Sequence, residues 1–176
     1  MKKRFLCALM ILALAAVPAL AEGGLISALA TPEPEPPRIA FERNDLSITL
    51  PAGMAILDDA ALELYEAAVQ TDYPETGKTL LVALDAQREA ALILTRTEST
   101  LDCLTAAQQA AEALIGNPEL AREAQYGENR CATFTCAING QIFRLYYFSD
   151  GAHLLTVGAS GMSRSEVEET LIELRF

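Results

Sequence analysis

Residues 131–160 read CATFTCAINGQIFRLYYFSDGAHLLTVGAS, and this stretch decides the fold. Two dipeptides, Asn139-Gly140 and Asp150-Gly151, divide it into three runs rich in apolar and aromatic residues. Such dipeptides are typical of two-residue type I′ turns, because both central residues of that turn need a positive φ. The stretch therefore predicts a three-stranded antiparallel meander, in which the residues flanking each dipeptide lie opposite each other.

Alternation along these strands sorts the side chains onto two faces of the meander. One face carries Phe134, Cys136, Phe143, Leu145, Tyr147 and Leu154. The other carries Ile142, Tyr146, Phe148, Leu155 and Val157, together with Cys131, Arg144 and His153. If no helix covers this second face, it is an exposed apolar patch of the kind that docks a partner. The residues of this candidate docking face are Tyr146, Phe148, Leu155 and His153.

Hydrophobic periodicity and helix caps predict the remaining elements of the domain. They are a strand over 46–50, a helix from 58 to about 71, a hairpin of 79–84 with 90–97, an alanine-rich helix that follows Thr100 and stops at Gly116, and a last helix opened by the capping box Ser163-Arg164-Ser165-Glu166. Together with the meander, these elements predict an α+β fold: an antiparallel β-sheet meander with about three α-helices packed on it.

The order strand, helix, hairpin, helix, meander, helix resembles the PsbP-like α/β fold, which extrinsic photosystem proteins share with bacterial envelope proteins of the DcrB type. The resemblance covers about Phe41 to Phe176. It rests on the strand that runs into Leu50-Pro51-Ala52-Gly53, on the hairpin-rich centre, and on the closing helix that ends in Leu174-Arg175-Phe176. It implies an α/β/α sandwich and a small module that docks onto partners at a membrane or envelope, usually without chemistry of its own. It implies no particular binding residue.

The first 38 residues predict export and a spacer. Three basic residues precede an apolar run, and Ala19-Leu20-Ala21 follows, which is the order of a secretory signal peptide over residues 1–21. We expect cleavage near Ala21 and a secreted or extracytoplasmic protein, at the cell surface or in the periplasm; an uncleaved anchor helix is the alternative. Residues 22–38 form a linker rich in proline and glutamate, and residues 39–176 form one domain.

Charge limits the classes of partner. The chain has 13 Lys and Arg against 24 Asp and Glu, and loss of the three basic residues of the signal peptide leaves 10 against 24, a net charge of −14. Such a surface repels phosphate backbones and anionic lipids. We therefore expect no nucleic acid as partner, contact with a membrane that is peripheral at most, and a monomer that binds an unknown protein or envelope component.

No motif for catalysis, a cofactor or a metal is found in the sequence. There is one histidine, His153, and the stretch 158–162 lacks the final glycine of a serine-hydrolase motif. No phosphate-binding loop or dinucleotide fingerprint occurs. We expect a non-catalytic accessory or adaptor module without a cofactor; the alternative is a binder of a small ligand or divalent cation, or less readily a hydrolase with an unrecognised site.

Three cysteines follow the signal peptide: Cys103, Cys131 and Cys136. In an oxidising compartment they permit one disulfide. Cys131 and Cys136 are five apart on one predicted strand and point to opposite faces, so they cannot pair with each other. A bridge from Cys103 to either Cys131 or Cys136 is one hypothesis, and three buried free thiols are the other.

Overall fold

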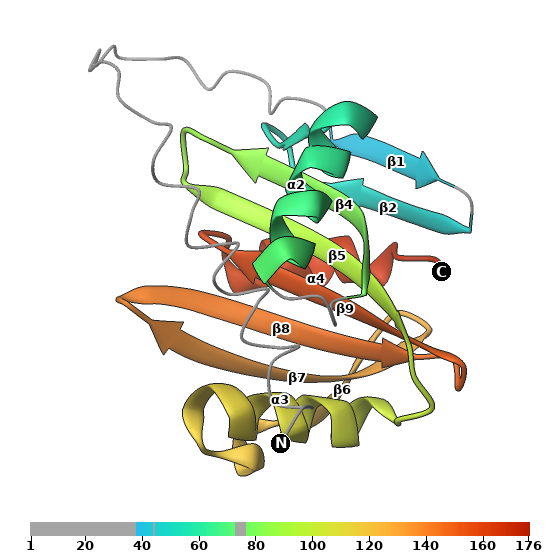
Figure 1. Ribbon diagram of the computed structural model, residues 1–176, viewed down its shortest axis with the longest axis vertical. Helices are drawn as coiled ribbons and strands as arrows, with labels where there is room; N and C mark the ends of the chain where they lie inside the picture. The colour runs from blue at the N-terminus through green and yellow to red at the C-terminus, as the bar shows by residue number, and fades with distance from the viewer. Residues whose placement is uncertain (1–37, 44, 73–76) are drawn as a thin grey trace.

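The computed structural model describes residues 38–43, 45–72 and 77–176. Its centre is a seven-stranded antiparallel sheet in the order β3-β4-β5-β9-β8-β7-β6, beside a two-stranded sheet of β1 and β2 (Figure 1). This arrangement confirms the predicted α+β class. The strands are β1 (Ile39–Arg43), β2 (Leu46–Leu50), β3 (Ala55–Ile56), β4 (Lys78–Asp85), β5 (Ala90–Glu98), β6 (Arg122–Tyr126), β7 (Asn129–Ile138), β8 (Gln141–Ser149) and β9 (His153–Ser160). The helices are α2 (Asp59–Asp72), α3 (Cys103–Ile115), the 3-10 helix η3 (Pro118–Leu120) and α4 (Arg164–Ile172).

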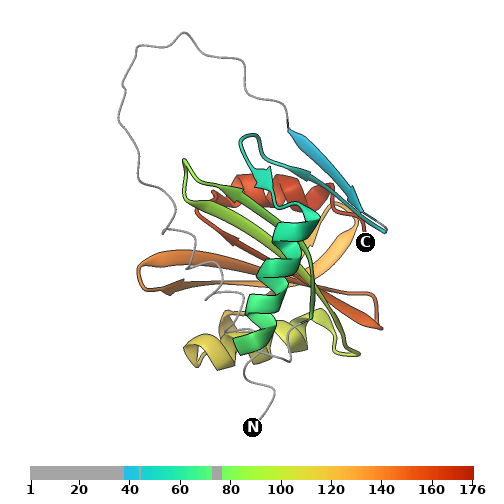
Figure 2. The same cartoon turned by 45° about the horizontal axis from the view of Figure 1, so that its top comes forward.

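The two faces of the seven-stranded sheet have different covers. Helices α2 and α3 pack on one face, where α3 approaches closely through a stripe of buried alanines. Helix α4 and strand β2 pack on the other face. Figure 2 shows α2 in front of β4 and β5, with α4 behind them. Both faces of the meander are therefore buried, each in its own apolar cluster.

The helix ends agree with the signals in the sequence. Gly116 ends α3 in the left-handed conformation, with φ 67°, and its N–H binds helix carbonyls. Ser163 and Glu166 form the predicted capping box of α4. Helix α3 is capped at its start by Asp102, whose side chain accepts a hydrogen bond from the backbone N–H of Thr105 at 2.9 Å.

The predicted strand register is right for one turn of the meander and wrong for the other. At Asn139-Gly140 both residues have positive φ, 53° and 82°, and the register predicted from this turn is confirmed. The register predicted from Asp150-Gly151 is wrong by two residues, because Ser149 pairs with Leu154. The Asp150 carboxylate accepts the N–H groups of the residues two and three positions ahead, at 2.8 and 2.6 Å, and holds a longer turn. A shift of two residues leaves every side chain on its predicted face.

The candidate docking face is mostly core. Tyr146, Phe148 and Leu155 are 2%, 0% and 1% exposed. They lie in the cluster that α4 and β2 cover, and the ring of Phe148 also meets the ring of Phe176 edge to face at 5.6 Å. The prediction that these three residues form a docking face is therefore wrong, because α4 and β2 bury the apolar face instead of leaving it to a partner.

The β1–β2 hairpin was not predicted as a pair. Strand β1 directly follows the linker and is antiparallel to β2. On its far side, β2 meets the end of the chain: Ser47 and Arg175 exchange two backbone hydrogen bonds, N to O at 2.9 and 2.8 Å. The first and last described segments are thus tied together above the seven-stranded sheet.

A polar network joins the β4–β5 turn to the segment after β2 and to the start of α4. Asp85 is 6% exposed, and its carboxylate accepts the backbone N–H groups of Gln87 and Arg88 at 3.0 and 3.1 Å, as well as the Nε–H of Arg88 at 2.6 Å. The same guanidinium pairs with Glu166 of α4 and donates to the carbonyl of Ala52 at 3.3 Å. One arginine therefore connects the turn, the segment after β2 and the start of α4.

Candidate functional site

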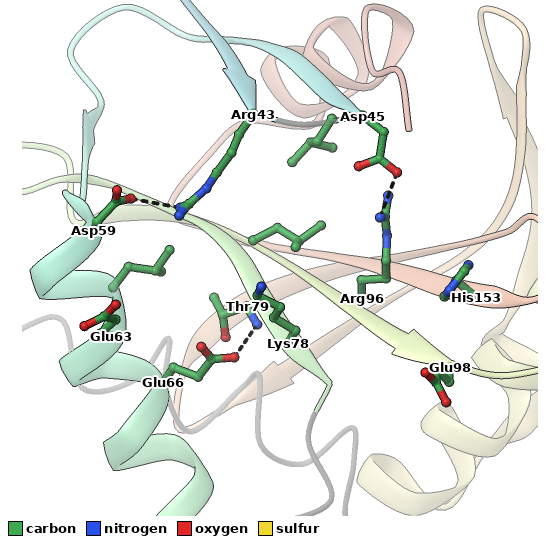
Figure 3. A pocket seen from close by; sticks show the side chains of 13 residues that line it. Arg43, Asp45, Asp59, Glu63, Glu66, Lys78, Thr79, Arg96, Glu98 and His153 are labelled. Carbon is green, nitrogen blue, oxygen red and sulfur yellow. Dashed lines mark hydrogen bonds and ion pairs between the residues drawn. The ribbon is translucent and has the colours of Figure 1, made fainter.

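A cleft opens at the edge of the face that β2 and α4 cover, between α2 and the ends of β4, β5 and β9 (Figure 3). Its volume is about 450 Å³, in the size range of small-molecule pockets. Its basic side chains are Arg43, Lys78 and Arg96, and its acidic ones are Asp45, Asp59, Glu63, Glu66 and Glu98. Leu46, Leu62 and Leu80 supply apolar lining.

Two arginines on opposite sides of the cleft are each held by one carboxylate (Figure 3). The Nη1 of Arg43 is 3.0 Å from the Oδ1 of Asp59, and the Nη1 of Arg96 is 2.9 Å from the Oδ2 of Asp45. The hydrogen bond from Arg96 lowers the pKa of Asp45 below its ordinary value. A guanidinium has five N–H donors, so these single contacts leave donors of both arginines for other groups.

Glu66 of α2 binds the backbone of β4 at the bottom of the cleft. Its Oε1 accepts the N–H of Thr79 at 3.0 Å. Strand β3 pairs only with Ala83 and Leu84, so the start of β4 has no strand on its outer side among the described residues. The register also shifts between Thr79 and Leu81, which is typical of an edge strand. Glu66 thus supplies an acceptor where a neighbouring strand would supply a carbonyl.

Lys78 differs from the other basic residues of the cleft. No ion pair or hydrogen bond of its ammonium group occurs within residues 38–43, 45–72 and 77–176, although five carboxylates line the same cleft. Figure 3 shows its side chain between Arg43 and Arg96, close to the point where Glu66 meets β4. Among the described residues, nothing therefore keeps this ammonium group from a ligand.

His153 is the one member of the predicted docking face that lines the cleft. It lies opposite Glu98 of β5, and its Nδ1 is 3.1 Å from the Oδ2 of Asp150. Backbone and side-chain hydrogen bonds from His153 and Ala152 lower the pKa of Asp150 to about 2. Asp150 thus orients the imidazole, and no hydroxyl or thiol in the described part of the chain forms a hydrogen bond with it.

A smaller cleft of about 250 Å³ adjoins the first one. Arg43, Asp59, Leu62 and Leu80 line both, so the two hollows form one groove that continues toward Phe41 and Leu57. The added part is lined by Glu42 and by the apolar residues Phe41, Ile56, Leu57 and Leu81. The groove as a whole therefore has mainly charged side chains at one end and more apolar side chains at the other.

The three predicted disulfide cysteines are free thiols. Cys131 is in the cluster under α4, Cys136 is in the cluster under α3, and Cys103 is half-buried at the start of α3. Burial raises the pKa of Cys131 to about 12 and that of Cys136 to about 11. The hypothesis of a bridge from Cys103 is not met in the structure, where Cys131 and Cys136 behave as small apolar core residues.

Two further features are absent from the described ranges. No group of three or more His, Cys, Asp or Glu side chains there could hold a metal ion. No helix there is both long enough and apolar enough to span a membrane. The predicted signal peptide and the predicted linker up to residue 37 lie outside the described residues.

Sequence reasoning missed the cleft apart from His153. Arg43, Lys78 and Arg96 come from three strands, and each one looks like an ordinary solvated charge in the sequence. The useful signal was the short alternating run Ile39–Arg43, which predicts a strand next to 46–50 and would have placed Arg43 beside Asp45.

The chain matches no protein-family model and no curated protein. Among solved structures it is similar to a crystal structure of a protein from Bacteroides thetaiotaomicron VPI-5482, with a TM-score of 0.48 and 13% identity; the match covers 74% of this chain and only 44% of that one. It is also similar to the solution structure of cyanobacterial PsbP (CyanoP) from Synechocystis sp. PCC 6803, with a TM-score of 0.38 and 11% identity, over 85% of this chain and 94% of that one. Neither a family nor a function of this chain is taken from these similarities.

Proposed function

We propose that the protein is an exported, non-catalytic binding protein that holds a small ligand in the cleft between α2 and the ends of β4, β5 and β9. The observation that carries the proposal is the ammonium of Lys78, which has no partner among the described residues and is exposed at a cleft of about 450 Å³ that Leu46, Leu62 and Leu80 also line. Such a pocket with a few converging polar groups is the usual form of a ligand site. Burial of Tyr146, Phe148 and Leu155 favours this site over docking through the meander.

A binding role fits the chemistry of the cleft better than a catalytic role. The imidazole of His153 is paired with the carboxylate of Asp150, and such a pair is only part of the set of residues that catalysis needs. General-base catalysis also requires a group whose proton the base takes, at hydrogen-bond distance or through one water. Two of the three basic groups in the described cleft are paired with carboxylates, whereas Lys78 and three glutamates have no ion pair within the described residues, which suits recognition of a charged molecule.

Site-specific photo-crosslinking in producing cells tests the proposed function. A photo-reactive residue replaces Glu98, which is exposed and lines the cleft, and in a control strain it replaces Glu119, which is exposed on η3 away from the cleft. We expect an adduct of small mass from position 98 alone, lost when Lys78→Gln is added. An adduct of protein size from position 98 supports the adaptor role instead, and equal adducts from both positions reject the cleft as a binding site.

The same material tests export. The intact mass of the recovered protein is expected to correspond to a chain that begins at Glu22 and has lost residues 1–21. Recovery of the full mass in the membrane fraction indicates the alternative, an uncleaved anchor.

A further inference from the structure

The charges that line the cleft are of both signs, so neither a simple anion nor a simple cation meets only opposite charges there. Three basic side chains face five carboxylates, and the protein carries a strong net negative charge, so a simple anion is repelled. A simple cation meets Arg43, Lys78 and Arg96 on the strand side of the cleft. A molecule with one charge of each sign and no net charge avoids both penalties.

The two charges nearest the open start of β4 are of opposite sign and are not paired with each other. Lys78 is on β4, and Glu66 of α2 binds the N–H of the next residue, Thr79, through Oε1 only. No ion pair within 4.0 Å joins Lys78 and Glu66, although Figure 3 shows both side chains at the same end of the cleft. A small molecule that carries one carboxylate and one ammonium has charges opposite to those of these two side chains.

The apolar wall beside these charges adds a second requirement. Leu62 and Leu80 line both hollows of the groove, next to the two charges. Leu62 is only 6% exposed, so an aliphatic side chain on the ligand would mainly cover the exposed part of Leu80 and remove that apolar area from water. The groove is larger than one amino acid needs, which leaves room for a second or third residue.

We infer that the cleft binds an amino-acid zwitterion with apolar side chains, either a free amino acid or a short peptide with free ends. The ligand carboxylate lies on Lys78 and its ammonium lies on the carboxylate of Glu66, while the side chain packs on Leu62 and Leu80. This inference rests on the proposed function, because it names the ligand of the same cleft.

Isothermal titration with matched ligands tests the inference. The ligands are leucine, trileucine, 4-methylpentanoate, which has only the carboxylate, isoamylamine, which has only the ammonium, and N-acetyl-leucinamide, which has neither. We expect leucine or trileucine to bind at least about tenfold more tightly than each of the three others, because each lost charge-assisted contact costs about that factor. Tighter binding of trileucine identifies the peptide as the ligand, and equal binding identifies the free amino acid.

Three variants link the binding to the named side chains. Lys78→Gln and Glu66→Gln each remove one charge, and the amide oxygen of the second can still accept the N–H of Thr79. Each is expected to weaken the best zwitterion at least about tenfold. Arg122→Gln, at an exposed position on β6, removes a charge far from the cleft and is expected to leave the dissociation constant unchanged.

Binding of 4-methylpentanoate as tight as that of leucine, or unchanged affinity in Lys78→Gln, overturns the inference. Absence of any zwitterion binding does the same. If the cross-linked adduct from position 98 is then still formed and still depends on Lys78, the proposed function stands with another ligand. If that adduct is also absent, the proposed function falls as well.

Discussion

Replacing Asp85 with alanine is expected to destabilise the fold more than removing any exposed ion pair. The carboxylate is nearly buried and accepts three hydrogen bonds, two from turn amides and one from the guanidinium of Arg88. Alanine removes both acceptor oxygens and with them all three hydrogen bonds. It also frees Arg88 from the position in which it reaches Glu166 and the carbonyl of Ala52.

The size of the effect follows from these contacts. A hydrogen bond between charged groups contributes about 1.5–3 kcal/mol, and the lower end applies here because the Arg88 side chain is 40% exposed. The two amide bonds contribute about 0.5–1 kcal/mol each, since the turn is exposed and water can replace the acceptor. We expect the free energy of unfolding to fall by about 3 kcal/mol, which corresponds to a Tm lower by roughly 10 °C for a domain of this size.

Urea unfolding followed by circular dichroism at pH 7 measures this loss. Asp45→Ala is the matched control, because it also removes an aspartate–arginine pair, here with a carboxylate that is 62% exposed. Solvent screens that pair, so the control is expected to lose only a small fraction of what Asp85→Ala loses. Equal losses in the two variants would refute the view that the Asp85 network holds the turn.

The loss of stability in Asp85→Ala is expected to depend on pH. Burial alone raises the pKa of Asp85, but the hydrogen bonds from the side chain and backbone of Arg88 outweigh it, and the pKa lies below the ordinary value of 3.8. A carboxyl whose folded pKa is depressed stabilises the fold above its unfolded pKa, and this contribution is lost as the pH falls through the folded pKa. The difference between wild type and Asp85→Ala is therefore expected to be constant from neutral pH down to about pH 5 and to shrink below about pH 4.

Three further outcomes can be measured on the same protein. Gly161→Ala places a Cβ 2.3 Å from the carbonyl oxygen of Glu89 at a φ of 66°, and should lower the free energy of unfolding by about 2 kcal/mol or more in urea titrations. Asn129→Ala removes two hydrogen bonds to carbonyls at the end of α4, at 2.8 and 3.4 Å, and should cost about 1 kcal/mol in the same assay. Cys131 and Cys136 should resist a thiol reagent in the native protein and react in denaturant; fast reaction of both in the native protein would contradict their burial.

Local chemistry decided which parts of the fold could be predicted. Asn139-Gly140 gave the correct register because both residues occupy the left-handed region that the turn requires. Asp150-Gly151 carries the same signal, but the aspartate side chain binds the backbone ahead of it and lengthens the turn. A dipeptide does not reveal that competition, which depends on where the next amides lie.

The site was harder to predict because its parts meet only in the folded chain. The apolar pattern of the meander correctly separated the two faces, yet it could not tell whether the second face is covered. Part of the cover is β2, which lies about a hundred residues earlier in the chain. The last residues of the chain also contribute, because Arg175 pairs with Ser47 of β2. Sequence patterns report local periodicity, whereas a cleft between distant segments depends on their docking.

The Ser47–Arg175 bridge also determines how the domain responds to mechanical load. Tension applied between Ile39 and Phe176 acts on the β1–β2 hairpin and on two backbone hydrogen bonds before it reaches the long ladders of the main sheet. Detachment of the hairpin would require these two bonds to break and Leu46, Ile48 and Leu50 to leave the core under α4. Arg43, Asp45 and Leu46 would leave with it, and the cleft would lose one wall while the seven strands stayed folded. A load on this hairpin is thus coupled by geometry to the shape of the cleft.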